Sequence, residues 1–353
     1  MEQTNKHADV VLGVDTHLDT HVAVLIDTLG RVLGTESIAT NVSGYRHLVE
    51  WATSFGPMTR VGVEGTGTYG AGLARYLSEA GIQVTEVNRP NRLRRRRRGK
   101  SDPTDAENAA RAVLSGEALA RPKAHTGLVE AMRAISVARR SAVKARTQAI
   151  NQLRSLLVSA PDPLRARLLK PTPLACINAC LALEEREHVP RLQPLILTLH
   201  LLASRWRALS AELRTLDSAL KHLTHQAAPN LMARFGVGPL TAATLLITAG
   251  DNPARLRNEA ALAALCGVSP REASSGKVVR HRLNRGGDRQ ANNALWTITL
   301  VRMRSEARTQ AYVARRTQEG RSNKEIQRCL KRYLVRELYP LIISDLQALD
   351  TAA

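Results

Sequence analysis

The sequence predicts an α/β domain at the N-terminal end of the chain and a mainly α-helical region after it. Short apolar runs of strand length alternate with helical patterns over residues 9–118. Over residues 124–226, apolar residues recur at steps of three and four, which is the spacing of amphipathic helices. A chain of 353 residues has room for two or three domains.

Three successive strands are expected to open the α/β domain. Apolar runs at residues 9–15, 20–27 and 31–38 are separated by short turns, a pattern typical of a meander. The elements expected next are helices at 43–55 and 69–80 and strands at 60–64 and 82–88. A three-strand meander followed by alternating helices and strands is the element order of the ribonuclease H type of fold.

Four carboxylates stand at the ends of these elements. Asp15 and Glu64 each end an apolar strand, and Asp102 and Asp105 lie at the start of a helical pattern. If the two strands are neighbours, the four acids converge at one end of the sheet. Carboxylate oxygens are the ligands that Mg²⁺ prefers, and a pair of such ions activates an attacking oxygen and stabilises a leaving one in phosphodiester chemistry. The pattern therefore predicts a nuclease-like magnesium site.

A structural role for the same acids is the alternative. Asp102, followed by Pro103, fits a helix N-cap, and Asp105 three residues later completes a pattern like a capping box. Asp15 and Glu64 fit ordinary turn acids. The joint pattern favours the metal site, because acids at the ends of two strands and at a helix start are an uncommon coincidence.

The chain is strongly basic. It has 51 Lys and Arg against 31 Asp and Glu, a formal net charge of +20, which predicts a polyanionic partner such as nucleic acid. The aromatic content of 3% argues against base stacking as the main mode of recognition.

No membrane partner is expected. No apolar stretch approaches the roughly 18 residues that a spanning helix needs, and MEQTNKHADV is not a signal peptide. The four cysteines lack zinc-type spacing, and we expect them to be reduced and buried. These features predict a cytoplasmic, nucleoid-associated protein.

The densest positive charge lies at residues 88–100, with seven arginines, one lysine and no acid. Such a run is often a solvated face or a flexible arm. Here it directly precedes Asp102, so a phosphate backbone drawn to it would pass beside the predicted metal site. The nucleic-acid contacts expected here are Arg92, Arg94, Arg95, Arg96, Arg97, Arg98 and Lys100.

A coiled coil is expected between the two ends of the chain. Two apolar stripes alternate steps of three and four, and the proline-rich stretch 161–173 is expected to turn the chain between the two helical arms. One stripe comprises Leu202, Trp206, Leu209, Leu213, Leu216, Leu220 and Leu223, and the looser one comprises Leu128, Met132, Ile135, Ala142, Ala149, Leu153 and Leu157. An intramolecular hairpin and a dimer seam are both compatible with this pattern.

Two further segments favour contact with nucleic acid. Gly236 and Gly238 lie between two short helical patterns, as in a helix-hairpin-helix element whose backbone N–H groups approach phosphates. Ser274 and Ser275 precede Gly276 in a cation-rich loop with Lys277, Arg280, Arg282, Arg285 and Arg289. A serine hydroxyl can attack phosphorus when cations offset its charge, although a Ser-Ser-Gly triplet alone is more often a turn.

Together these segments resemble the insertion sequence 110 family of transposases, the DEDD recombinases. The resemblance covers residues 9 to about 345 in the family's order. The segments that carry it are GVDTHLDTHVAVL, VGVEGTGTYG, KSDPTDAENAARA, FGVGPLTAATLL, CGVSPREASSGKVVRHRLNRGGDRQANNALW and IQRCLKRYLVRELYPLI. It implies a Holliday-junction-resolvase-like catalytic domain at 1–120, a coiled-coil region at 121–227 and a C-terminal transposase domain at 228–353.

The resemblance also implies a mechanism and partners. Asp15, Glu64, Asp102 and Asp105 match the family's four acids, and Ser275 matches its serine nucleophile, with Ser274 as the neighbouring alternative. The implied cofactor is Mg²⁺, and the implied partners are the DNA of the element ends and target and a structured noncoding bridge RNA. We also expect a homo-oligomer, either a dimer or a tetramer.

Two other functions are compatible with the residues. A metal-dependent nuclease or junction resolvase would hydrolyse DNA with water and form no covalent link to the protein. A basic RNA-binding scaffold would use the acids only as helix caps. A covalent protein–DNA adduct distinguishes the recombinase from the nuclease, and metal-dependent strand cleavage distinguishes both from the scaffold.

Overall fold

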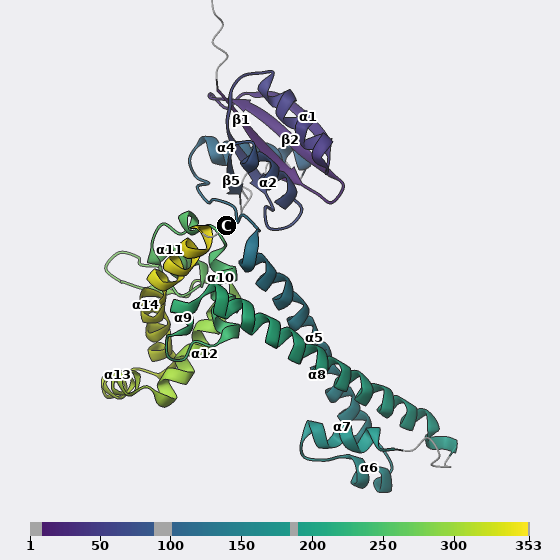
Figure 1. The fold of residues 1–353 in the computed structure, drawn as a ribbon. Coiled ribbons are helices and arrows are strands. Elements are labelled where there is room, and N and C mark those ends of the chain that lie inside the picture. Colours follow the sequence, from purple (N-terminus) through teal and green to yellow (C-terminus); the bar gives the residue numbers. More distant parts are fainter. Residues whose placement is uncertain (1–8, 88–100, 184–189, 352–353) are drawn as a thin grey trace, which may run out of the picture. The chain divides into compact units, whose positions relative to one another are not determined.

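The computed structural model describes residues 9–87, 101–183 and 190–351, which form two compact units (Figure 1). The first unit contains the residues up to 125 together with the segment 249–257, and the second contains the remainder. The N-terminal unit is a mixed α/β sheet domain, and most of the second unit is helical.

The first unit contains a five-stranded sheet in the order β3-β2-β1-β4-β5. Its elements are β1 (Val10–Thr16), β2 (Thr20–Asp27), β3 (Val32–Ala39), α1 (Val42–Thr53), β4 (Met58–Glu64), α2 (Ala71–Glu79), β5 (Gln83–Val87) and α4 (Asp102–Leu114). β2 pairs antiparallel with β1 and β3, whereas β4 pairs parallel with β1 and β5. The predicted meander and the elements after it are confirmed to within two residues.

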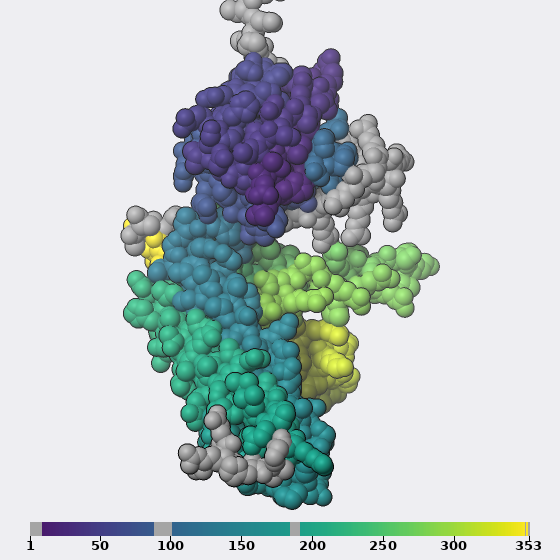
Figure 2. Space-filling model, turned by 90° about the vertical axis from the view of Figure 1, so that its right-hand side faces the viewer, coloured from purple at the N-terminus to yellow at the C-terminus, as the bar shows by residue number. Residues whose placement is uncertain are grey.

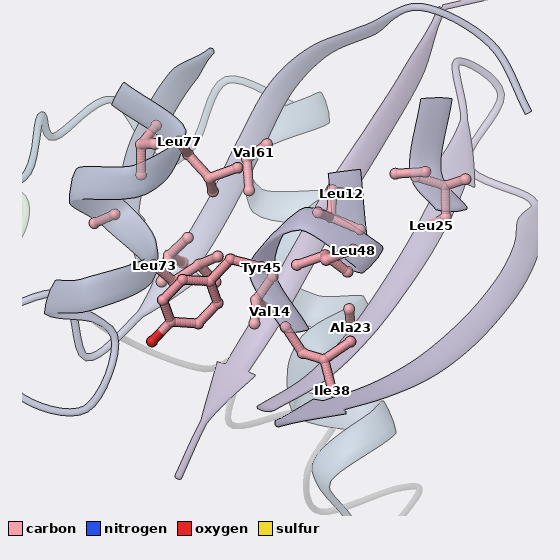
Figure 3. Close-up of a cluster of buried hydrophobic side chains, with 14 of the residues drawn as sticks. Leu12, Val14, Ala23, Leu25, Ile38, Tyr45, Leu48, Val61, Leu73 and Leu77 are labelled. Carbon is pink, nitrogen blue, oxygen red and sulfur yellow. The ribbon is translucent and has the colours of Figure 1, made fainter. Parts of the chain in front are cut away.

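Alternation along β1 gives the sheet two different faces. Leu12 and Val14 point toward α1 and α2 and belong to a buried cluster whose helical members include Tyr45, Leu48 and Leu73 (Figure 3). The alternate residues Val11, Gly13 and Asp15 point toward α4, and Val11 packs with the alanines of that helix. Asp15 therefore continues the face of β1 that α4 covers.

Helix α4 lies unusually close to the sheet because the two residues beneath it are glycines. A Cβ atom on Gly13 would lie 2.1 Å from the carbonyl oxygen of Ala106 and 2.3 Å from the backbone nitrogen of Ala110. A Cβ atom on Gly62, which is paired with Gly13 across β1 and β4, would lie 2.8 Å from the carbonyl oxygen of Ala109. This backbone contact fixes the position of the first turn of α4 against the sheet edge.

The segment 249–257 is held to the first unit by polar contacts. The Asp251 carboxylate accepts a hydrogen bond from the backbone N–H of Ala124 (2.8 Å), and the Asn252 amide donates to the carbonyl of Pro122 (2.9 Å). Arg255 donates to the Arg121 carbonyl (2.9 Å) and lies 3.3 Å from a Glu86 oxygen. The chain thus returns to the N-terminal unit after α10.

The second unit is built around two long helices. Its elements are α5 (Gly127–Val158), α6 (Asp162–Leu168), α7 (Pro173–Leu181), η1 (Pro190–Leu192), α8 (Gln193–Ala227), α9 (Pro229–Met232), α10 (Pro239–Ala249), α11 (Glu259–Leu265), β6 (Arg271–Glu272), β7 (His281–Arg282), α12 (Arg289–Ser305), α13 (Ala307–Gln318) and α14 (Asn323–Thr351). Helices α5 and α8 lie side by side as an intramolecular hairpin (Figures 1 and 2). The short helices α6 and α7 pack with both of them in one buried cluster.

The buried seam of the hairpin differs in part from the predicted stripe. Leu202, Leu213 and Leu220 are buried as expected. Trp206 is only partly buried, with the Arg146 guanidinium 5.7 Å from its ring centroid, and Ser210 is buried instead. A helix of 3.6 residues per turn drifts relative to a heptad repeat, so the residues that face the partner change along the seam. The proline-rich stretch contains α6 rather than a simple turn.

The C-terminal helices are joined through buried charged groups. Arg302 of α12, 7% exposed, makes two 2.8 Å hydrogen bonds to Glu337 of α14 and a 3.0 Å bond to the carbonyl of Phe235. Asp345 of α14 is buried and accepts hydrogen bonds from Asn230 and from the backbone N–H of Leu231. Over the described part of the chain, the structure contains no helix that is both long and apolar enough to span a bilayer.

Replacing Gly13 by alanine tests the contact between α4 and the sheet. The added methyl group would overlap the helix backbone, which cannot rotate away as a side chain can, so we expect a loss of about 3 kcal/mol or more of unfolding free energy. Gly67→Ala is the matched control, because a Cβ atom there meets nothing within 4 Å. Equal melting temperatures for the two variants in thermal denaturation would contradict the proposed packing.

Candidate functional site

The first group of candidate residues lies at one edge of the sheet. Asp15 is close to the end of β1 and is 9% exposed, and Glu64 is the last residue of the neighbouring parallel strand β4. The two strands are in register through Val14 and Val63, and the Thr16 hydroxyl donates to the Glu64 carbonyl at 2.9 Å. Both acids follow a glycine by two residues, so alternation directs both toward the α4 face.

The first turn of α4 brings two more carboxylates to this edge. Asp102 is the first residue of the helix and is partly exposed, whereas Asp105 is 2% exposed. The interpretation of Asp102 as the N-cap is wrong: the cap is Ser101, whose hydroxyl accepts a hydrogen bond from the Thr104 N–H. Ser101 has the extended backbone of a cap, whereas Asp102 is already helical. Asp102 is therefore not the cap of α4.

A histidine that the sequence interpretation missed lies among these acids. His17 Nε2 is 3.4 Å from an Asp15 oxygen and 3.3 Å from an Asp102 oxygen. Ligand atoms of these three residues all lie within 4.8 Å of one another. The signal in the sequence was the spacing Asp15-Thr16-His17, because residues two apart at the end of a strand share a face.

The electrostatics of the cluster favour a bound cation. Burial raises the pKa of the Asp15 carboxyl, the neighbouring His17 lowers it, and the carboxylates of Asp105 and Asp102 raise it further. Several carboxylates gathered at a partly buried position repel one another, and a divalent cation offsets that repulsion. Carboxylate oxygens suit hard cations such as Mg²⁺ or Mn²⁺, and an imidazole is tolerated by the latter. The residues present therefore fit a divalent metal.

The second group of candidate residues lies in a hairpin of the second unit. β6 and β7 pair antiparallel, with Arg271 opposite Arg282. The backbones of Ser275 and Val278 exchange two 3.1 Å hydrogen bonds, which leaves Gly276 and Lys277 as a two-residue turn. Gly276 has a φ of +57°, a conformation that glycine adopts without strain at the first position of such a turn.

The hairpin separates its two serines. The pairing of Arg271 with Arg282, Glu272 with His281 and Ser275 with Val278 follows a single register. Directly paired residues share a face, and so do residues two apart on one strand. One face therefore contains Ser275, Arg271, Arg280 and Arg282, and the other contains Ser274, Glu272 and His281. The Ser274 hydroxyl also accepts a hydrogen bond from the Arg280 N–H at 3.2 Å.

The candidate residues Gly236 and Gly238 lie in the turn that precedes α10. Gly236 has a φ of +83° and joins α9 to α10. The Gly238 N–H, at the start of α10, donates to the Thr241 hydroxyl at 3.0 Å. A phosphate at this turn would therefore compete with Thr241 for that N–H group.

Of the remaining candidates, Lys277, Arg280 and Arg285 are exposed in or beside the hairpin. The arginine-rich run, with Arg92, Arg94, Arg95, Arg96, Arg97, Arg98 and Lys100, lies outside the described residues.

Comparison with known proteins identifies the family. Residues 12–160 match a family model described as a transposase, of the insertion sequence 110 DEDD type. Residues 228–314 match a second model, described as the transposase IS116/IS110/IS902 family. The chain belongs to the insertion sequence 110 family of transposases.

A curated relative supports this family assignment. The chain is similar to the "Insertion element IS110 uncharacterized 43.6 kDa protein" of Streptomyces coelicolor, with 28% identity over 162 residues. The alignment covers 45% of this chain and 40% of the relative. The two family matches place the acid cluster in one matched segment and the Ser275 hairpin in the other. The DEDD family implies a divalent metal, in agreement with the donor atoms at the sheet edge.

Replacing Asp15 by asparagine tests whether the carboxylate cluster is functional rather than structural. A carboxyl whose pKa is raised on folding destabilises the folded protein when it is ionised, so in metal-free buffer at neutral pH we expect Asp15→Asn to raise the melting temperature. Glu79→Gln, at an exposed position of α2, should leave the melting temperature unchanged. A lower melting temperature for Asp15→Asn would instead indicate that this carboxylate stabilises the fold.

Proposed function

We propose that this chain is the transposase of an insertion sequence and that it cuts and rejoins DNA strands through a covalent serine–phosphate link. The observation that carries the proposal is the cluster of Asp15, His17 and Asp102 at the sheet edge. Asp105 raises the pKa of Asp15, and Glu64 ends the neighbouring strand β4. The order of the five strands supports a ribonuclease H-like domain of the Holliday-junction-resolvase type.

The acids would hold Mg²⁺. Asp15, Glu64, Asp102 and Asp105 supply carboxylate oxygens from two strands and one helix, and His17 supplies a nitrogen between two of them. When bound, the metal would stabilise the negative charge that develops on the phosphate and its leaving oxygen. The chain's own contribution is to hold the acids in place through the glycine contact, so that the site needs little reorganisation.

Ser275 is the proposed nucleophile. Its Oγ would form a bond to phosphorus while the bond from phosphorus to one strand's oxygen breaks. The serine proton leaves to solvent, and the departing oxygen takes up a proton. Rejoining is the reverse, in which a hydroxyl of another strand attacks phosphorus and restores the serine. The bond energy is retained throughout, so no external energy source is required.

The hairpin register supports Ser275 over Ser274. Arg271, Arg280 and Arg282 share the face of Ser275, and guanidinium groups offset phosphate charge well. Ser274 is on the face with Glu272, whose carboxylate would repel a phosphate, and its hydroxyl is engaged with the Arg280 N–H. The negative charge of a phosphate therefore favours the Ser275 hydroxyl over that of Ser274 as the nucleophile.

The proposed partners are the DNA of the element ends and target, a structured noncoding bridge RNA, and further copies of this chain in a dimer or tetramer. The net charge of +20 supports binding of nucleic acid as a class. Guidance by the RNA rests on the family alone. Strand exchange between element-end and target DNA should therefore require that RNA.

A metal-dependent junction resolvase that uses water is the alternative function. The acid cluster supports it equally, because the same donors would serve a hydrolytic reaction. The serine on an arginine-rich face favours the recombinase, since a hydrolase has no use for it.

Replacing each serine in turn by alanine tests the proposed chemistry. Ser275→Ala should abolish the covalent protein–DNA adduct and strand exchange, because it removes the atom that bonds to phosphorus, while binding of DNA remains. Ser274→Ala is the adjacent control and should retain both activities. Denaturing gel electrophoresis with labelled element-end DNA, Mg²⁺ and the RNA measures the adduct. Adduct formation by Ser275→Ala would refute this nucleophile, and metal-dependent cleavage with no adduct in wild type would favour the resolvase.

A further inference from the structure

The second unit contains a pocket that neither candidate site uses. It lies between α12, α14, the loop before the Ser275 hairpin (residues 266–270) and the segment 281–285, which comprises β7 and the start of the next loop. Its volume is about 870 Å³. Pockets of this size accommodate a nucleotide or a molecule of similar size. We call it the α12–α14 pocket.

The lining of this pocket is strongly basic. Among the residues that the structure describes, six arginines and one lysine line it, with no aspartate or glutamate. Arg332 forms a bidentate pair with Glu259, which lies outside the lining. Arg285 and Arg328 are exposed. The pocket therefore favours a ligand with negative charge.

Lys331 and Asn292 form a hydrogen-bonded pair that lines one part of the pocket. Lys331 Nζ donates to the Asn292 side-chain oxygen at 2.8 Å, and the Asn292 amide donates to the carbonyl of Cys266 at 2.9 Å. Burial lowers the pKa of the Lys331 ammonium, and the nearby Arg328 lowers it further. The structure records no carboxylate partner for Lys331 in the described part of the chain. A ligand that brings hydrogen-bond acceptors would offset the cost of holding this ammonium here.

Two exposed aromatic rings complete the pocket. Trp296 is 41% exposed and Tyr333 is 50% exposed, in a chain with only 3% aromatic residues. Trp296 lies one helical turn after Asn292 and Asn293, so the ring and the amides share a face of α12. The Arg336 guanidinium lies 5.9 Å from the centroid of the Tyr333 ring. Large aromatic rings left in contact with water beside cations and amides are typical of surfaces that bind unpaired nucleotides.

We propose that the α12–α14 pocket binds an unpaired nucleotide of a single-stranded nucleic acid. The base stacks on Trp296, the exposed Asn293 amide and Lys331 contact acceptors on the base edge, and the arginines contact the flanking phosphates. Arg282 both lines this pocket and shares the hairpin face of Ser275. The pocket thus holds a strand that leads toward the proposed nucleophile. This assignment rests on the proposed function, because it gives the transposase a subsite for a base that has left its duplex.

The test is the affinity of the full-length protein for short fluorescein-labelled oligothymidylate and oligouridylate, measured by fluorescence anisotropy at one fixed ionic strength. Trp296→Leu keeps an apolar side chain but removes the ring, and should weaken binding by about tenfold or more. Trp296→Phe keeps a stacking surface and should retain most of the affinity. A fully paired duplex should bind Trp296→Leu and wild type equally, because its bases are not available for stacking.

A second pair of variants tests whether positive charge inside the pocket contributes more to binding than positive charge elsewhere on the surface. Lys331→Met should weaken binding of the single strand more than Arg214→Gln, which removes one positive charge from an exposed position on α8. The nucleotide comes from DNA if oligothymidylate binds more tightly and loses affinity when the Trp296 ring is removed. It comes from RNA if oligouridylate does so. Equal affinity of Trp296→Leu and wild type for both single strands would overturn the proposal. These measurements need no strand exchange, so failure of the proposed recombinase reaction would leave them interpretable.

Discussion

The acid site depends on the contact between helix α4 and the two glycines beneath it. Gly13 and Gly62 are paired across β1 and β4, and neither leaves room for a Cβ atom below the helix. Because the helix backbone rests directly on the strands, its first turn reaches the edge where Asp15 and Glu64 emerge. Alanines at positions 106, 109 and 110 keep the helix side of this contact equally small. Contacts between backbone atoms and alanine methyl groups thus position the acids of α4 at the sheet edge.

The Asp15 carboxylate works against folding when it is ionised. Asp15 is largely buried, its pKa is raised by that burial, and Asp102 and Asp105 add further negative charge. A protein selected only for stability would not gather three carboxylates at one partly buried position. The repulsion among these carboxylates is greatest at the position where a bound metal ion would offset their charge. In the second unit, the described lining of the α12–α14 pocket contains cations and no carboxylate, and Glu259, outside that lining, pairs with Arg332 and Arg336.

Elements were predicted correctly from the sequence where a residue pattern is compatible with only one kind of secondary structure. The strands and helices of the N-terminal unit followed from apolar runs, and Asp15 and Glu64 were recognised because each ends such a run. The cap of α4 was misassigned, because Ser101 and Asp102 are both good cap residues and only the backbone distinguishes them. His17 was missed because its significance depends on Asp102, which is far away in the sequence. The pocket was missed because α12 and α14 supply its walls from separate segments, and overall composition argued against stacking.

Electron paramagnetic resonance measures directly whether the acid site binds a divalent cation, because free and protein-bound Mn²⁺ give different spectra and no reaction is needed. We expect the wild-type protein to bind the ion and both Asp15→Asn and Gly13→Ala to lose that binding, the first because it removes a ligand and the second because it displaces α4. Circular dichroism should verify that each variant is folded at the temperature used. Wild-type-like Mn²⁺ binding by folded Asp15→Asn, or no binding by the wild type, would contradict the account.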